Sequence, residues 1–184
     1  MQVTGKNTLY KARYLQIIAK TVSTTGGQTR VWETVERTNV HGSGAVVIIA
    51  LTKDGNLLFE KNWRAGTESY VIQFPAGLTD LDGESETEAA TRELLEETGY
   101  AAKTLIPVLL SPLAADLSST RAMHYFAPDV EYAGAPSGSD VEGIEVVEVP
   151  VSEADSFMLH PPEGVELDLQ VPGILWALRM KRLL

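Results

Sequence analysis

The sequence predicts a mixed α/β (α+β) fold that carries a small N-terminal antiparallel β annex, and three patterns indicate it. Within the first forty residues, apolar and polar side chains alternate with a period of two, which is typical of strands. The continuous apolar run Ala45–Leu51 suits a strand that is buried on both faces. A helix with clear capping signals follows Ser85. We expect the annex to span residues 1–42 and the main domain residues 43–184.

Composition limits the classes of protein that remain. The chain has 184 residues, 15 Lys and Arg against 25 Asp and Glu, a net charge of −10 and no cysteine. A disulfide scaffold, a thiolate metal site and a cysteine nucleophile are therefore excluded. The acidic balance argues against a nucleic-acid partner. No run approaches the roughly 20 apolar residues that span a membrane, and the polar start lacks a signal-peptide core, so we expect a cytoplasmic protein without a membrane partner.

The annex is predicted to be a hairpin or a short meander. Ala12–Ala19 reads as one strand, Thr24–Gln28 as a turn and Thr29–Arg37 as the returning strand. Such a unit is marginally stable alone, so it must pack on something else.

The main domain is predicted to contain further strands on both sides of the helix. Asp54 and Gly55 form a strong turn signal after the buried strand. The remaining expected elements are strands at Leu57–Lys61, Tyr70–Phe74, Lys103–Leu110, Ala122–Pro128 and Gly143–Val149, and a closing helix at Ile174–Leu183.

The central helix presents a concentrated acidic face. Ser85 and Glu88 have the spacing of a capping box, and Gly99 suits the position after the last turn. At about 100° per residue, Glu96 and Glu97 lie about −60° and +40° from Glu93. We expect the core face of this helix to consist of Ala90, Thr91, Leu94 and Leu95.

Three carboxylates on one helix face indicate a bound cation. Like charges four residues apart, as in Glu93 and Glu97, cost a few tenths of a kcal/mol. Oxygen ligands on a rigid helix suit Mg²⁺ or Mn²⁺. Arg92 can pair with Glu88 or with Glu84 and hold the preceding loop against the helix. A solvated, glutamate-rich surface is the alternative interpretation of such a helix taken alone.

The surrounding motif resembles the Nudix box, G-x5-E-x7-R-E-U-x-E-E-x-G-U, where U is apolar. Gly77, Glu84 and the run Arg92–Tyr100 match it in residue type, with six residues instead of five between Gly77 and Glu84. The extra residue falls in a loop, where an insertion is cheap. The resemblance implies the Nudix α/β/α sandwich with a mixed sheet, and hydrolysis of a diphosphate linked to another moiety.

The Nudix resemblance also implies site residues. Glu93 and Glu97 would ligate the metal together with the carbonyl of Ala76, and Glu96 would be a ligand or an immediate support. Arg92 would belong to the same catalytic centre. Bound Mg²⁺ would neutralise the diphosphate and lower the pKa of the attacking water.

A wider resemblance covers most of the chain. Thr29–Thr38, Asn62–Arg64 and Ile72–Gly77 are similar to segments of ADP-ribose pyrophosphatases. This implies a homodimer through the N-terminal strands, with Trp32 and a second aromatic, Tyr14, stacking on the adenine. Packing at a core or interface is the alternative for both aromatics.

Two further residues take their roles from the same resemblance. Arg64 would contact the phosphates, and an ordinary surface arginine is the alternative. Glu142 would serve as the base or an extra ligand, in competition with Asp140 and Glu145.

The substrate is less closely indicated, because the loop Ser111–Thr120 lacks the Pro-Gly pair that is usual in ADP-ribose enzymes. The sequence therefore predicts hydrolysis of ADP-ribose or related nucleoside diphosphate sugars to a nucleoside monophosphate and a sugar phosphate. The alternatives are a house-cleaning nucleoside triphosphate pyrophosphatase and a catalytically silent nucleotide-binding regulator.

Overall fold

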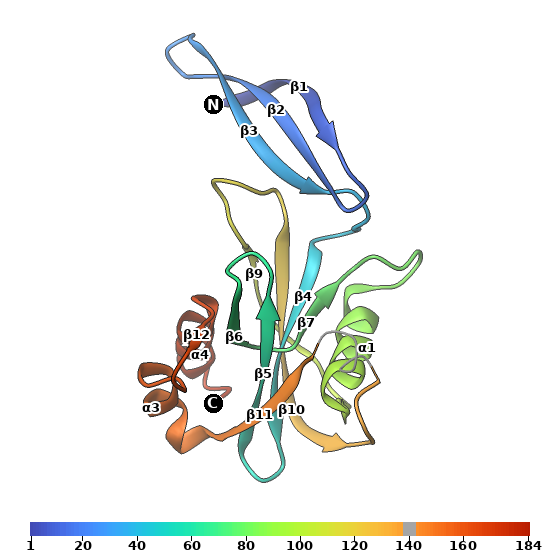
Figure 1. Ribbon diagram of the computed structural model, residues 1–184, viewed down its shortest axis with the longest axis vertical. Coiled ribbons are helices and arrows are strands. Elements are labelled where there is room, and N and C mark those ends of the chain that lie inside the picture. The colour runs from blue at the N-terminus through green and yellow to red at the C-terminus, as the bar shows by residue number, and fades with distance from the viewer. Residues whose placement is uncertain (138–142) are drawn as a thin grey trace.

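The protein forms an α/β/α sandwich with a separate N-terminal β annex, which confirms the predicted fold class (Figure 1). The computed structural model describes residues 1–137 and 143–184. The annex strands are β1 (Gln2–Lys11), β2 (Leu15–Ser23) and β3 (Thr29–Arg37). The strands of the main domain are β4 (Gly44–Thr52), β5 (Asn56–Arg64), β6 (Ser69–Gln73), β7 (Ala76–Leu78), β8 (Tyr100–Ala101), β9 (Ile106–Pro112), β10 (Arg121–Tyr132), β11 (Glu145–Pro150) and β12 (Val165–Leu167). The helices are α1 (Glu86–Thr98), the 3₁₀ helix η1 (Val151–Glu153), α3 (Ala154–Leu159) and α4 (Gln170–Met180).

The annex is an antiparallel meander of three strands in the order β1-β2-β3, and it projects away from the main domain (Figure 1). The first of these strands, β1, was not expected, and the second begins at Leu15 instead of Ala12. Most side chains of β1 are exposed, so no core selects an apolar alternation there. The strand is held instead by backbone pairing with β2.

The main sheet is mixed and central to the sandwich. Its strands follow the order β12-β6-β5-β4-β10-β8, while β11 pairs with β5, β7 with β4 and β9 with β10. The pairs β4–β10 and β6–β12 are parallel, and the others are antiparallel. The expected apolar strand lies at the centre as β4, where all but one of its residues are buried.

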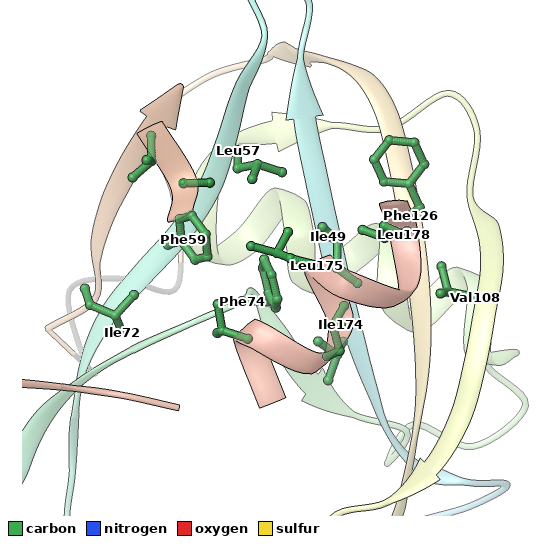
Figure 2. Packing of buried hydrophobic residues seen from close by; sticks show 14 of the residues in the cluster. Ile49, Leu57, Phe59, Ile72, Phe74, Val108, Phe126, Ile174, Leu175 and Leu178 are labelled. Carbon is green, nitrogen blue, oxygen red and sulfur yellow. The ribbon is translucent and has the colours of Figure 1, made fainter. Parts of the chain in front are cut away.

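Two apolar cores cover the two faces of the sheet. Leu57 and Phe59 of β5 belong to the core beneath α3 and α4, which Figure 2 shows from close by. Leu58 lies between them in sequence and belongs to the other core, beneath α1. This alternation leaves the next residue on the α1 side, Glu60, fully buried.

Helix α1 is capped as predicted. The Ser85 side chain accepts from the Glu88 backbone N–H, the Glu88 carboxylate accepts from the Ser85 N–H, and Gly99 adopts φ 76°. The expected core face of the helix was partly wrong, however. Ala90 and Leu94 are buried, but Thr91 and Leu95 are exposed, and Glu97 is buried in their place. The part of the acidic face that bears Glu97 therefore packs against the domain, while Glu96 stays partly exposed.

The C-terminal region differs from the prediction in its boundaries. Helix α4 begins at Gln170 instead of Ile174, so Pro172 lies inside its first turn. Proline is tolerated there because first-turn N–H groups have no partner within the helix. The short elements α3 and β12 were not expected. No helix within the described residues is long and apolar enough to cross a bilayer.

Candidate active site

Helix α1 lies against the short strand β7 (Figure 1), and two of its acidic side chains, Glu93 and Glu97, meet the backbone of that strand. Gly77 of β7 is so close to Glu93 that a Cβ atom there would stand 1.9 Å from the Glu93 carboxyl carbon. The neighbouring Ala76 donates its N–H to Glu97 Oε2 at 3.1 Å. The strand thus brings the backbone of residues 76 and 77 next to both carboxylates.

Arg92 ties the helix to the loop that precedes it. Its Nε and Nη2 donate to the two carboxylate oxygens of Glu84 at 2.8 and 3.0 Å. Its Nη1 donates to Glu93 at 2.9 Å and to Glu96 at 3.3 Å. The Glu84 pair agrees with the prediction, whereas Glu88 is engaged in the capping box. Arg92 is the cation that partly balances this acidic cluster.

Glu97 lies deepest in the cluster. Burial is the main cause that raises its pKa, and the Glu60 carboxyl, to which it is hydrogen-bonded, raises it further. Burial also raises the pKa of Glu93, against the opposing effect of Arg92. The ionised forms of both carboxyls are therefore poorly compensated by the protein itself.

A cavity of about 760 Å³ opens beside these carboxylates. Its polar lining includes the carboxylates of Glu93 and Glu97, the amide of Gln73 and three arginines, Arg37, Arg64 and Arg92. A second hollow of about 560 Å³ adjoins it and shares Arg64 and Gln73 with it. The cavity thus combines positive and negative side chains, an arrangement suited to a phosphorylated ligand together with a cation.

The donor set fits a hard divalent cation. Glu97 is buried and Glu93 is partly buried, both carboxyls have raised pKa values, and a cation would relieve the burial cost of their charge. Within residues 1–137 and 143–184, no three acidic or histidine side chains already surround one point as a finished metal site. Glu93 accepts from Arg92 and Glu97 from Ala76 instead. Glu96 is more exposed and accepts from Arg92.

Of the other site residues predicted from the sequence, some line the cavity and others do not. Arg64 lines the cavity, but Trp32 and Tyr14 lie on the annex, 44% and 54% exposed, and neither lines it in the single chain. A core role for either aromatic is therefore wrong. Glu142 and its competitor Asp140 lie outside the described residues, whereas Glu145 accepts from Lys61.

Sequence reasoning missed Glu60, Gln73 and Arg37. Glu60 carried a usable signal, because a carboxylate at a position that alternates with buried Leu58 in a central strand requires an explanation. Gln73 directly precedes the core residue Phe74 in the fifth expected strand, and it faces the opposite side of the sheet. Arg37 ends β3 and reaches the cavity only through the tertiary fold.

Comparisons with known proteins agree with this architecture. Residues 41–168 match the family model described as the NUDIX domain. The chain is 30% identical over 154 residues to the ADP compounds hydrolase NudE of Escherichia coli (strain K12), covering 84% of this chain and 80% of that protein. It is 36% identical over 104 residues to the ADP-sugar pyrophosphatase of Mus musculus, covering 53% of this chain and 47%, about half, of the mouse protein. A crystal structure of an ADP compounds hydrolase superposes with a TM-score of 0.78 at 25% identity, covering 98% of this chain and 92% of that one.

The chain therefore belongs to the Nudix family. The sequence prediction of a Nudix pyrophosphatase is confirmed.

Proposed function

We propose that the protein is a Mg²⁺-dependent pyrophosphatase of ADP-ribose or related nucleoside diphosphate sugars. The observation that carries this proposal is the cavity that Glu93 and Glu97 line together with Arg64. The relatives described as an ADP compounds hydrolase and an ADP-sugar pyrophosphatase support the choice of substrate class. The products would be a nucleoside monophosphate and a sugar phosphate.

Glu93, Glu97 and the Ala76 carbonyl would hold the cation, with Mn²⁺ as a possible substitute for Mg²⁺, and Glu96 would support them through Arg92. Bound metal supplies charge neutralisation of the diphosphate and a water of lowered pKa. Binding would draw Glu93 from its hydrogen bond with Arg92, which keeps its two bonds to Glu84. Glu142 remains the proposed base of the reaction.

The two adjoining hollows suit a substrate with a group on each side of a diphosphate. Arg64 lines both of them, so its guanidinium would contact phosphate oxygens at the junction.

We further propose that two copies associate through the annex. Val31 and Trp32 of β3 are 63% and 44% exposed, and several apolar side chains of β1 and β2 are exposed beside them. In a dimer, Trp32 would reach the adenine in the partner's cavity. Light scattering should give about twice the chain mass of 20.0 kDa, and a monomer would remove this role of Trp32.

The test of the catalytic proposal is a phosphate-release screen with Mg²⁺ over ADP-ribose, ADP-glucose, UDP-glucose, GDP-mannose, NADH and dGTP. We expect ADP-ribose or another nucleotide sugar to lead, and a lead by dGTP would favour the triphosphatase alternative. Glu97→Gln should abolish most turnover at saturating Mg²⁺, while the exposed Glu163→Gln control should retain it. Unchanged turnover in Glu97→Gln would refute the metal-ligand assignment.

A further inference from the structure

A chain of polar side chains runs from Arg64, which is exposed at the end of β5, through the buried Gln73 and Glu60 to the deepest carboxylate of the site. Arg64 Nε and Nη2 both donate to Gln73 Oε1, at 2.8 and 2.6 Å. Gln73 Nε2 donates to Glu60 Oε2 at 3.5 Å, and the Glu60 carboxyl is hydrogen-bonded to that of Glu97. The two ends of the chain line the same cavity, whereas Glu60 does not line it.

The backbone holds the middle of this chain rigidly. Glu60 of β5 and Gln73 of β6 are directly opposed in the antiparallel pair, so their side chains leave the sheet side by side. Glu60 is fully buried and Gln73 is 7% exposed. Their sequence neighbours Phe59, Ile72 and Phe74 belong to the apolar core on the other face of the sheet (Figure 2).

The chemistry of each group determines the direction of the chain. A guanidinium only donates, so the amide oxygen of Gln73 must face Arg64. Its amide nitrogen is then turned toward Glu60, which accepts. A glutamate at position 73 would also satisfy Arg64, but it would repel Glu60. A leucine would satisfy neither group, so the glutamine matches both neighbours.

A role in stability alone explains this arrangement poorly. A buried carboxylate is expensive to desolvate, and apolar residues of similar volume often stabilise a fold as well or better. By contrast, altering residues that are hydrogen-bonded to metal ligands commonly changes metal affinity by about 10- to 100-fold.

We propose that Gln73 and Glu60 are positioning residues that couple the Arg64 guanidinium to the Glu97 carboxylate. Arg64 fixes the Gln73 amide, the amide orients Glu60, and Glu60 orients Glu97 toward the cation. Because such coupling is reciprocal, phosphate binding at Arg64 and cation binding at Glu97 reinforce each other. This inference rests on the proposed metal site.

The test is Mn²⁺ affinity of the free protein, measured by calorimetry without nucleotide. Three arginines line the cavity, Arg37, Arg64 and Arg92, and only Arg64 is hydrogen-bonded to Gln73 among the described contacts. Arg92 already pairs with Glu84 and Glu93, so Arg37 is the one suited to serve as a control. Removing a positive charge should by itself strengthen cation binding or leave it unchanged, as expected for the matched control Arg37→Met. The coupling predicts the opposite for Arg64→Met, a several-fold loss of Mn²⁺ affinity.

Two more variants locate the effect in the middle of the chain. Gln73→Met should weaken Mn²⁺ binding by about 10-fold, and adding Arg64→Met to it should cause no further loss. Gln73→Leu, which also satisfies neither neighbour and changes no charge, should likewise weaken Mn²⁺ binding, and it serves if Gln73→Met does not fold.

The outcomes separate this inference from the proposed function. If Arg64→Met binds Mn²⁺ as well as Arg37→Met does, or if its loss persists unchanged in the Gln73→Met background, the coupling is wrong while the metal site stands. If the wild-type protein binds no Mn²⁺, the metal site itself is wrong and the coupling is overturned with it.

Discussion

Gly77 and Glu93 lie so close together that any side chain at position 77 would collide with the Glu93 carboxylate. A Cβ atom on Gly77 would stand 1.9 Å from the Glu93 carboxyl carbon and 2.1 Å from its Oε1 atom. The conflicting atoms are the far end of a flexible side chain, so the backbone can stay in place if the carboxylate moves. Glycine at position 77 is thus required for the position of the Glu93 carboxylate and not for folding.

Gly77→Ala should therefore leave the protein folded and remove most of its activity. A displacement of about 1 Å in a reacting group can cost about 100-fold in rate, and we expect a loss of that order in kcat/KM. Thermal melting and the phosphate-release assay on the same preparation check this. Gly173→Ala, where a Cβ would meet nothing within 4 Å, is the matched control. Full activity in Gly77→Ala would contradict this view of Glu93.

Arg92→Ala should destabilise the protein as well as impair it. The guanidinium and Glu84 are largely shielded from water, with side chains 24% and 13% exposed, and form a two-bond pair. Removing the Arg92 guanidinium leaves the Glu84 carboxylate poorly satisfied, so we expect a loss of about 2 kcal/mol in the free energy of unfolding. Urea denaturation measures it.

The control for Arg92 is a double-mutant cycle with Glu84→Ala. If the two side chains act as a pair, the double variant should lose clearly less stability than the sum of the single variants. Arg92→Lys should recover only part of the loss, because an ammonium cannot reproduce the two parallel hydrogen bonds. Additive losses would show that the pair contributes nothing as a unit.

Stability should fall as the pH is lowered below 6.5, in part because of His124. Burial lowers the pKa of this fully buried side chain below its ordinary value of 6.5, although hydrogen bonds with Gln170 and the Leu109 carbonyl oppose the shift. The unfolded chain takes up a proton near pH 6.5, and the folded chain does so only at lower pH. The contribution of neutral His124 is thus fully present above pH 6.5 and is lost as the pH falls through the folded pKa.

The measurement is the free energy of unfolding by urea between pH 5 and pH 8. One such histidine contributes at most about 1.4 kcal/mol per pH unit to the slope. His124→Gln should flatten the slope between pH 5 and pH 6.5, and His160→Gln, at an exposed position, is the control. Equal slopes in wild type and His124→Gln would exclude this contribution.

Trp32→Ala should raise KM for ADP-ribose and change kcat little. Stacking of a base on an aromatic ring contributes about 1–3 kcal/mol, which corresponds to roughly 5-fold or more in KM. Initial rates against substrate concentration test this, with the exposed Trp176 of α4 replaced by alanine as the control. A KM equal to that of the control would remove Trp32 from the substrate site. A parallel measurement on Tyr14→Ala would separate stacking by the second aromatic from simple packing.

Local sequence patterns determined several elements of the fold and the spacing of the site residues on α1. The buried strand β4 is a continuous apolar run, and α1 is bounded by a capping box and a glycine, so short-range chemistry was sufficient to predict both. The spacing of Glu84, Arg92, Glu93 and Glu97 was likewise readable, because residues one turn apart on a helix share a face. The resemblance to the Nudix box rested on this spacing, and the comparisons show that the chain belongs to the Nudix family.

The tertiary structure decided how these residues are used. The exposed strand β1 is defined by its pairing with β2 and not by its own side chains. The face of α1 that bears Glu97 is buried because β7 brings Ala76 and Gly77 against it, which the helix pattern alone does not contain.

The series of hydrogen-bonded side chains from Arg64 to Glu97 shows most clearly what the tertiary structure alone decides. Gln73 and Glu60 are separated by 13 positions in the sequence and become neighbours only through the register of β5 and β6. Sequence patterns report the preferences of each segment, which are set by bonds and contacts within a few residues. The meeting of distant polar groups depends on strand register and on burial from both sides, and both are properties of the folded chain as a whole.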